Sequence, residues 1–574
     1  MIKKITYLGL FIIYFFKEKL KLFKDTIVCL YRYRFFNYLI FLKNRNFNPY
    51  YDKEYREFIN INKDKWKKSN FETNKENKKI LVTSLLHSHP AYCYGEAIIG
   101  QNLSEYFKAE LVGLIIKGDI PGEVTLRSFG IKNIKYLDKG NLILRLKLFF
   151  KAFEIISRFE SVDDFLKFEL DQIDFGKAVY ENYVRYTGVG TVDKLNFKFC
   201  YLLADAIYIK KFCSRLLDDE NIGHVVQSET QFIPPSIIYQ FFLSNDIKVY
   251  ARHGGGKKNS MRIFNDKSEA YTLRSEVSKK KFNQIYENFK DLAIKKGELH
   301  LKKRFTGKTG NDDSGSVGIA HRNKIDFSKD QLCNFFNWKK EKKIICIFGH
   351  ALIDGNFLSG WRVFKDNLTW LRKTLHCINK LDDYYWLVKP HPMEIEYAKS
   401  KTNTIKEFNS IIGKKDNVRL TPENISLNSL FNVVDSVVTC NGSVALEFAS
   451  FGKKSLMAAR SDYSDIIFEN QIPKNEKEYI EKLKNLDKLE KVTQEQINKS
   501  KVYTFIQWNL NLVENPLYPD TFEPNLFVNK EKFWKDTCEN IKKYDEKKDF
   551  FKKMLFYQLE NGDRHTSNLN ELKS

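Results

Sequence analysis

Residues 343–354 read KIICIFGHALID, and residues 385–394 read YWLVKPHPME. Each stretch joins a short apolar run to a turn that carries His and either Asp or Pro. Short apolar runs bounded by turn signals predict strands that are buried on both faces. A helical pattern over 366–380 separates the two runs. Strand, helix and strand in this order predict a parallel βαβ unit.

The same alternation extends in both directions along the chain. Downstream, we predict strands at 418–420, 436–440 and 455–458, with a helix over 443–450. Upstream, we predict strands at 79–84, 110–116, 224–227 and 247–251, helices over 97–107 and 234–243, and a mostly helical stretch over 141–220. The sequence therefore predicts an α/β fold with two Rossmann-like, doubly wound domains that face a cleft.

The expected division of the chain follows from these patterns. We expect a helical segment and linker over 1–75, a first Rossmann-like domain over 76–330, a second over 331–520, and a helical tail over 521–574. Residues 50–79 are polar and suit a linker, and residues 257–330 are polar and weakly patterned. Within them, GKTGNDDSGS (307–316) lacks the GxxxxGK[ST] spacing of a phosphate loop and predicts a flexible loop.

Charge and cysteine usage narrow the class of protein. The 95 Lys and Arg against 72 Asp and Glu give a net charge of +23. Residues 1–70 carry +10 of it, from 16 basic and 6 acidic side chains. A basic balance favours an anionic partner, but no nucleic-acid-binding signature is visible, so we expect no nucleic acid. The nine cysteines form no CxxC pair, which favours buried thiols in a reducing compartment and no zinc site.

The N-terminus predicts a membrane partner. Residues 5–16 read ITYLGLFIIYFF, with lysines on both sides. Twelve residues are too few for a spanning helix, and no small-residue cleavage site follows. Residues 27–42 interleave Arg32 and Arg34 with aromatic residues. We therefore expect peripheral attachment to an anionic membrane surface at the cytoplasmic face. The alternatives are helices packed on the main body and a signal anchor.

Three motifs follow predicted strands of the second domain, where parallel sheets bind ligands. The first presents Lys389, His391, Pro392 and Glu394 from a proline-framed turn, which suits a phosphate and a ribose or base. The second places Asn441, Gly442 and Ser443 before a helix, with Glu447 one turn further on; this suits an anion or, as an alternative, a helix cap. The third offers His350 and Asp354 as candidate catalytic groups.

Candidate residues of the first domain follow its strands in the same way. Glu229 ends a predicted strand and is a candidate base or nucleophile. In the turn after the first strand lie His89, Tyr94 and Glu96. We take His89 as a further catalytic candidate, and Tyr94 and Glu96 as acceptor-loop residues. His253, Gly254 and Gly255 end another strand and would let the backbone approach an acceptor.

KPHPME followed by TCNGSVALEFASFGKKSL resembles bacterial capsule and surface-polysaccharide glycosyltransferases, and FGHALIDGNFLSGWRVFKDNLTWLRKTL is similar to the same group. The group includes Kdo transferases, and bacterial sialyltransferases share its HP and Ser/Thr motifs. The resemblance covers about 345–465 and, more loosely, 80–256. It implies the GT-B fold, with His391 and Ser443 on the donor phosphate and Glu447 and Glu394 on the ribose or base. It implies no metal and no cofactor. The acidic motif that carries the sialyltransferase base is not evident here.

The function expected from this resemblance is transfer of a sugar from a nucleotide-activated donor onto a capsule or surface polysaccharide or its lipid-linked acceptor. A CMP-linked acidic sugar such as Kdo is the expected donor. Whether the sugar's configuration is inverted or retained stays open, as does the choice of base. The alternatives are a CDP-polyol phosphotransferase of the teichoic-acid type, a sugar-nucleotide epimerase and a non-catalytic capsule-assembly scaffold.

Overall fold

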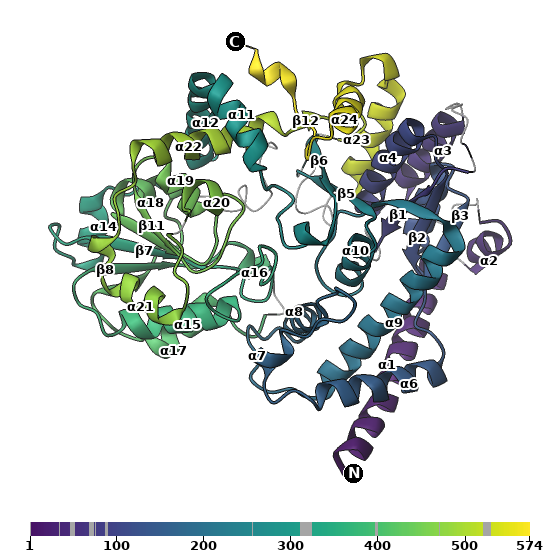
Figure 1. The fold of residues 1–574 in the computed structure, drawn as a ribbon, viewed down its shortest axis with the longest axis horizontal. Helices are drawn as coiled ribbons and strands as arrows, with labels where there is room; N and C mark the ends of the chain where they lie inside the picture. Colours follow the sequence, from purple (N-terminus) through teal and green to yellow (C-terminus); the bar gives the residue numbers. More distant parts are fainter. Residues whose placement is uncertain are drawn as a thin grey trace. The chain divides into compact units, whose positions relative to one another are not determined.

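The computed structural model describes residues 2–33, 35–45, 52–67, 74, 76–85, 90–254, 256–309, 324–396, 400–469, 471–519 and 530–573. The chain forms two compact units. Unit 1 comprises Met1–Tyr183, Lys194–Ala270 and Glu514–Asp563, and unit 2 comprises Val184–Asp193, Tyr271–Val513 and Arg564–Ser574. Each unit is built around one mainly parallel sheet (Figure 1).

The sheet of unit 1 has the strand order β12–β6–β5–β4–β1–β2–β3. Neighbouring strands from β5 to β3 in this order run parallel, and β6 is antiparallel to β5. Its strands are β1 (Lys79–Ser84), β2 (Leu111–Ile116), β3 (Asn133–Leu137), β4 (Ile222–Val226), β5 (Lys248–His253), β6 (Lys258–Phe264) and β12 (Val513–Glu514).

Helices pack in pairs around this sheet. The pair α4 and α5 lies against β1 and β2, and α9 packs on both α6 and α10. The helices before residue 130 are α1 (Ile2–Tyr33), α2 (Phe35–Lys43), α3 (Lys53–Lys67), α4 (Pro90–Phe107) and α5 (Ile120–Ser128). The later ones are α6 (Leu142–Ile156), α7 (Val162–Phe165), α8 (Phe175–Thr187), α9 (Phe197–Glu220), α10 (Pro235–Leu243), α23 (Lys530–Lys543) and α24 (Phe550–Asn561).

The sheet of unit 2 is parallel throughout, with the order β11–β10–β7–β8–β9. Its strands are β7 (Ile344–Phe348), β8 (Tyr385–Lys389), β9 (Val418–Leu420), β10 (Ser436–Thr439) and β11 (Lys454–Met457). Its helices are α11 (Lys279–Asn288), α12 (Lys290–Phe305), α14 (Lys329–Phe336), α15 (Asn367–Ile378), α16 (Met393–Glu396), α17 (Thr404–Ile411), α18 (Leu427–Val433), α19 (Val444–Ala449), α20 (Ser464–Ile467), α21 (Glu476–Lys484) and α22 (Gln494–Phe505).

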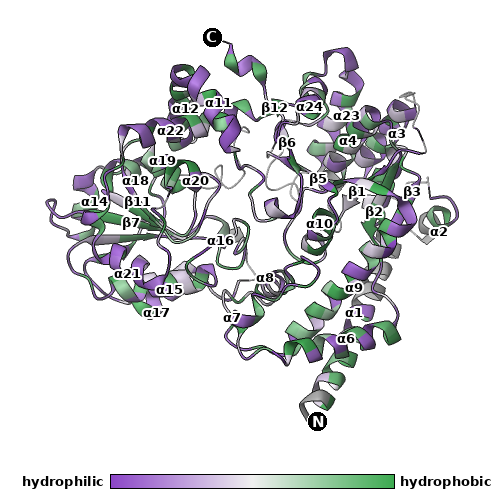
Figure 2. Cartoon of the chain, in the orientation of Figure 1, coloured by the Kyte–Doolittle hydropathy of each residue, from purple (hydrophilic) through white to green (hydrophobic). Residues whose placement is uncertain are grey.

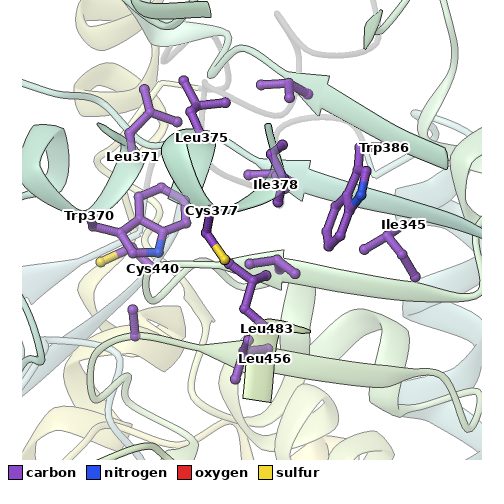
Figure 3. Close-up of a cluster of buried hydrophobic side chains, with 14 of the residues drawn as sticks. Ile345, Trp370, Leu371, Leu375, Cys377, Ile378, Trp386, Cys440, Leu456 and Leu483 are labelled. Atoms are coloured by element: carbon purple, nitrogen blue, oxygen red, sulfur yellow. The ribbon is translucent and has the colours of Figure 1, made fainter. Parts of the chain in front are cut away.

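Alternate residues of β7 and β8 enter two different cores of unit 2. Ile345 and Trp386 join the core under α15 and α21, where Trp370 also lies (Figure 3). Ile344 and Leu387 join the core under α14 and α18 on the other face of the sheet. Successive strand residues point to opposite faces, so both faces of this sheet are buried. Figure 2 shows β7 in green, the hydrophobic end of the scale.

The predicted fold class is confirmed, because each unit is a Rossmann-like layered unit with a mainly parallel sheet. Strands β1 and β8 have the predicted bounds, and the stretch 141–220 is helical in α6 to α9. The predicted cleft between the domains stays a prediction.

Two stretches differ from the sequence prediction. Residues 53–67, expected in a linker, form α3 instead. Its Tyr55, Phe58 and Ile59 are buried, and the rings of Phe58 and Trp534 stack with centroids 4.5 Å apart. The weakly patterned stretch 257–330 contains β6, α11 and α12. Few apolar residues suffice to hold α11 and α12 in place, because α22, which is distant in the sequence, packs on both helices.

The bounds of the units also differ from the expected domains. The chain passes into unit 2 after Ala270, whereas the expected boundary is at residue 330. The expected tail, 521–574, divides between the units: residues to Asp563 belong to unit 1, where α23 packs on α3. Most of the loop predicted at 307–316 lies outside the described residues.

Candidate functional site

Three neighbouring strands of unit 2 end at one cluster of polar side chains. His350 follows β7, the central strand of the three, while His391 follows β8 and Asn441 follows β10. The Gly349 N–H donates to the Lys389 carbonyl at 2.8 Å, which ties the two strand ends together. A Cβ on Gly349 would lie 3.0 Å from that carbonyl oxygen, so a residue without a side chain suits this approach. The structure therefore brings the three predicted motifs to one edge of the sheet.

His350 is oriented by an amide on α15. The Asn367 Nδ2 lies 3.0 Å from His350 Nδ1 and also donates to the Ala351 and Asp354 carbonyls. Its Oδ1 accepts from Arg362, which fixes the amide orientation. Since Nδ1 accepts, the proton of the neutral ring lies on Nε2. Burial lowers the pKa of His350, so the ring is neutral at pH 7.

His391 is held in the same state. Its Nδ1 accepts from the Met393 N–H at 3.2 Å, which leaves Nε2–H as a donor. Burial lowers the pKa of His391 to about 3, with further lowering by His350 and Lys389. The two imidazoles stack with centroids 5.8 Å apart and planes 23° apart. Burial also lowers the pKa of Lys389. The cluster thus combines two neutral imidazole N–H donors with one amine, all partly exposed.

Glu394 is bound at the start of α17. Its two carboxylate oxygens each accept from the Thr404 N–H at 3.2 Å, and Oε1 also accepts from the Thr404 hydroxyl at 3.1 Å. Burial nevertheless raises the pKa of Glu394 to about 7. A carboxyl group at this pKa exchanges a proton near neutral pH. Pro392 lies between His391 and α16 and shapes the turn that holds both side chains.

The turn after β10 is fixed by residues that the sequence did not single out. Tyr463 donates its hydroxyl to the Gly442 carbonyl at 2.6 Å, and Ser461 donates to the Asn441 carbonyl at 3.0 Å. The Asn441 side chain donates to Ser359 at 3.2 Å. Both carbonyls of the turn are therefore occupied from inside the unit.

Ser443 is exposed and directly precedes α19, whereas Glu447 is buried. Glu447 Oε1 accepts from Ser443 Oγ at 2.8 Å and from Arg304 Nε at 3.0 Å. The side chains of Arg304 and Glu447 are only 9% and 6% exposed. Glu447 thus occupies the position of a residue that orients Ser443 rather than one that reaches a ligand.

Asp354 lies in the loop after β7, with its carboxylate 3.6 Å from Arg185, in the segment of the chain that belongs to unit 2. The same loop supplies Asn356, whose side chain accepts from the Asn367 N–H at 2.9 Å. Asn367, Arg362 and Thr404, like Tyr463 and Ser461, were not singled out as candidates, because only their spatial neighbours give them a role.

In unit 1, two predicted residues come together at the carboxyl ends of β1 and β4. Glu96 and Glu229 line a pocket of about 10 Å³ with Thr83, Ser84, Leu85, Tyr92, Cys93 and Gln227. Glu96 accepts from the Ser228 N–H at 3.2 Å, and Glu229 accepts from the Gln231 N–H at 2.7 Å. A pocket of this size admits one water-sized group, such as a hydroxyl.

The other predicted residues of unit 1 lie elsewhere. Tyr94 belongs to the core of α4, where it is 1% exposed and donates its hydroxyl to the Leu517 carbonyl at 2.8 Å. Gly254 has φ = +110°, and a Cβ there would lie 2.8 Å from the Lys258 carbonyl oxygen. The glycine therefore serves the tight turn from β5, which His253 ends, to β6. His89 and Gly255 lie outside the described residues.

No group of three or more His, Cys, Asp or Glu side chains gathers as a possible metal site within the described ranges. Metal-free chemistry stays a prediction.

No family model matches the sequence, and no curated protein matches it. Solved structures similar to the chain include S. aureus MnaA with UDP, at 13% identity and a TM-score of 0.24, with 80% of this chain and 97% of that chain covered. The wall teichoic acid polymerase TagF matches at 11% identity and a TM-score of 0.20, with 91% and 98% covered. The Thermobaculum terrenum O-GlcNAc transferase matches at 10% identity and a TM-score of 0.24, with 81% of this chain and 69% of that chain covered. TM-scores this low do not establish a shared activity.

Proposed function

We propose that the unit-2 cluster binds the phosphate of a nucleotide-activated sugar, and that the chain is a glycosyltransferase of the GT-B type. The observation that carries the proposal is the convergence of two neutral imidazole N–H donors, Lys389 and Asn441 at the carboxyl edge of a parallel sheet. Phosphate oxygens accept hydrogen bonds from such donors, and ligands of parallel sheets bind at this edge.

In this proposal, His391 Nε2–H donates to the donor phosphate, and Ser443 turns its hydroxyl hydrogen from Glu447 to the phosphate when the donor binds. As the glycosidic bond breaks, negative charge develops on the leaving nucleotide. Positioned N–H donors in a site with little water stabilise that charge without a metal ion. Glu394 and Asp354 are left to orient the ribose or base and the sugar.

The acceptor in this proposal is a hydroxyl of a growing surface glycan or its lipid-linked precursor at the inner face of the cytoplasmic membrane. Glu229 is the proposed base, because its carboxylate lines a pocket that admits a single hydroxyl. His350, Asp354 and His89 are the other candidates. The sequence resemblance favours a CMP-linked acidic sugar such as Kdo as the donor.

The first experiment is thermal stabilisation of the full chain by CMP, CDP, UDP, GDP and TDP. A ligand at about 100 times its Kd stabilises by about 2.7 kcal/mol. We expect one nucleotide to stabilise the wild type and His376→Ala, which changes an exposed histidine of α15. We expect no stabilisation of His391→Ala. A wild type that no nucleotide stabilises would contradict the proposal and favour a non-catalytic scaffold.

A second experiment separates transfer of a sugar from transfer of a polyol phosphate. The enzyme is incubated with CMP-Kdo or with CDP-glycerol and a glycan acceptor, and the released nucleotide is measured. We expect release of CMP from the sugar donor that depends on the acceptor. Release of CMP from CDP-glycerol instead would assign the teichoic-acid type of reaction.

A further inference from the structure

Helix α1 has two apolar faces, and unit 1 covers only one of them. Phe11 lies on the covered face, with its ring centroid 4.8 Å from that of Phe149 on α6. Tyr7 and Tyr14 lie on the same face, with centroids 5.7 Å and 5.3 Å from that of Phe197 on α9. These contacts attach the part of α1 from Tyr7 to Tyr14 to α6 and α9.

The opposite face carries large apolar side chains that remain exposed among the described residues. Ile5 is 63% exposed, Ile13 62%, Phe16 54% and Leu20 65%; Ile12 is 39% exposed. At about 100° per residue, these five positions fall within an arc of about 100° whose centre lies about 150° around the helix from Phe11. An apolar stripe of this kind, on the side away from the core, indicates a second partner.

Basic residues border this stripe on both sides. Lys17 and Lys19 are exposed; in the same helical projection, Lys17 lies about 90° from the centre of the stripe on one side and Lys19 about 70° on the other. The one acidic residue between them, Glu18, faces Lys139 at 3.6 Å. Within residues 1–24, the sequence has six lysines and a single acidic residue. Lysines in this position extend their apolar stems along the stripe and place their ammonium groups at the level of lipid phosphates.

We propose that α1 lies in the plane of an anionic bilayer, with Ile5, Ile12, Ile13, Phe16 and Leu20 among the acyl chains. None of the described helices combines the length and hydrophobicity that crossing a bilayer requires. The stripe from Ile5 to Leu20 covers about 24 Å of helix, less than the ~30 Å hydrocarbon core. The six lysines against one acidic residue within residues 1–24 favour an anionic lipid surface over a second copy of the helix, because like charges would face one another in a dimer. This proposal specifies how the chain reaches the membrane in the proposed function, and it rests on that function for the location of the acceptor.

The test is co-sedimentation of the full chain with phosphatidylcholine vesicles, with and without phosphatidylglycerol, in the absence of nucleotide. We expect binding that requires phosphatidylglycerol and weakens with salt. Ile13→Glu with Phe16→Glu is expected to lower vesicle binding by about tenfold or more, because two charges enter the apolar region. Lys17→Glu with Lys19→Glu is expected to abolish the preference for anionic vesicles. Leu299→Glu with Ile405→Glu, at exposed apolar positions of unit 2, is the matched control and is expected to bind like the wild type.

Thermal stabilisation by nucleotide without vesicles reports on the fold and on the donor site of each variant. If Ile13→Glu with Phe16→Glu unfolds, Ile5→Gln with Leu20→Gln replaces it in the same assay. Binding by these variants equal to that of the wild type would overturn the proposal, as would equal binding to neutral and anionic vesicles. A lipid-free dimer that the stripe variants abolish would assign the face to a second copy and also overturn it. Loss of nucleotide binding with intact vesicle binding would contradict the proposed function alone.

Discussion

The carboxyl edges of the two sheets carry opposite kinds of hydrogen-bonding groups. In unit 2, the edge presents donors: neutral His350 and His391, with Lys389 beside them. In unit 1, the edge presents acceptors: Glu96 and Glu229, with Gln227 at the same pocket. The Gln227 Nε2 donates to two backbone carbonyls, and its buried Oε1 has no hydrogen-bond partner among the described residues. The same type of parallel sheet therefore has an edge suited to an anion in unit 2 and an edge suited to a hydroxyl in unit 1.

The largest effect on this difference between the two edges is expected from His391→Ala. Loss of one positioned donor to a developing oxyanion costs about 10²–10³ in rate, so we expect kcat/KM for the donor to fall by that factor. The steady-state rate with varied donor concentration is the measurement, with His376→Ala as the control. A rate within about threefold of the wild type would remove His391 from the anion-binding edge.

Glu229→Gln tests the acceptor edge. Loss of a general base costs about 10² or more in kcat, while nucleotide binding depends on unit 2 and should be unchanged. We expect a fall in kcat with an unaltered nucleotide-induced thermal shift. Glu105→Gln removes a carboxylate of α4 that pairs with Lys552 and serves as the matched control. Full activity in the Glu229 variant would transfer the role of base to another candidate.

Arg304→Met tests the support behind Ser443. It leaves the Glu447 carboxylate buried without its guanidinium, which costs about 3 kcal/mol of unfolding free energy. Urea unfolding is the measurement. Arg304→Met combined with Glu447→Leu is expected to recover part of the loss, because the buried charge is then gone. No recovery in the double variant would show that the two side chains stabilise the unit independently.

The smallest effect concerns the pH dependence of stability. Glu394 has a folded pKa of about 7 against 4.5 in the unfolded chain. Between these values the folded state binds the additional proton, so this group's contribution falls as pH rises, by up to ~1.4 kcal/mol per pH unit. His391 has a folded pKa of about 3 against 6.5 in the unfolded chain. It acts in the opposite direction, because its contribution to stability rises with pH between these two values.

Glu394→Gln removes the first of these two contributions. We therefore expect the variant to gain stability relative to the wild type as pH rises from about 5 to 7, measured by urea unfolding at each pH. Glu495→Gln is the control, because a hydrogen bond from Lys499 lowers the pKa of this exposed carboxyl to below the window. Parallel profiles for Glu394→Gln and the wild type would show that Glu394 does not titrate there.

Much of the site was predictable because it depends on local order along the chain. A buried strand followed by a proline-framed turn placed His391, and the same logic placed His350 and Asn441 at neighbouring strand ends. The role of Glu447 was not predictable, since Arg304 lies 143 positions away. Tyr94 illustrates the same limit: its partner is the Leu517 carbonyl, 423 positions away. Neither pairing leaves a signal in the spacing of residues.

The sequence by itself determined the two mainly parallel sheets, the strand ends that carry the polar motifs, and the basic, apolar character of the N-terminus. Runs of apolar residues and turn residues determine these features through local propensity and burial. The tertiary structure alone decided that residues 53–67 form a helix packed on α23, that Glu394 is bound by Thr404, and that α1 keeps one apolar face uncovered. These outcomes depend on which distant segments meet in the folded chain, because burial and pairing belong to the packed state.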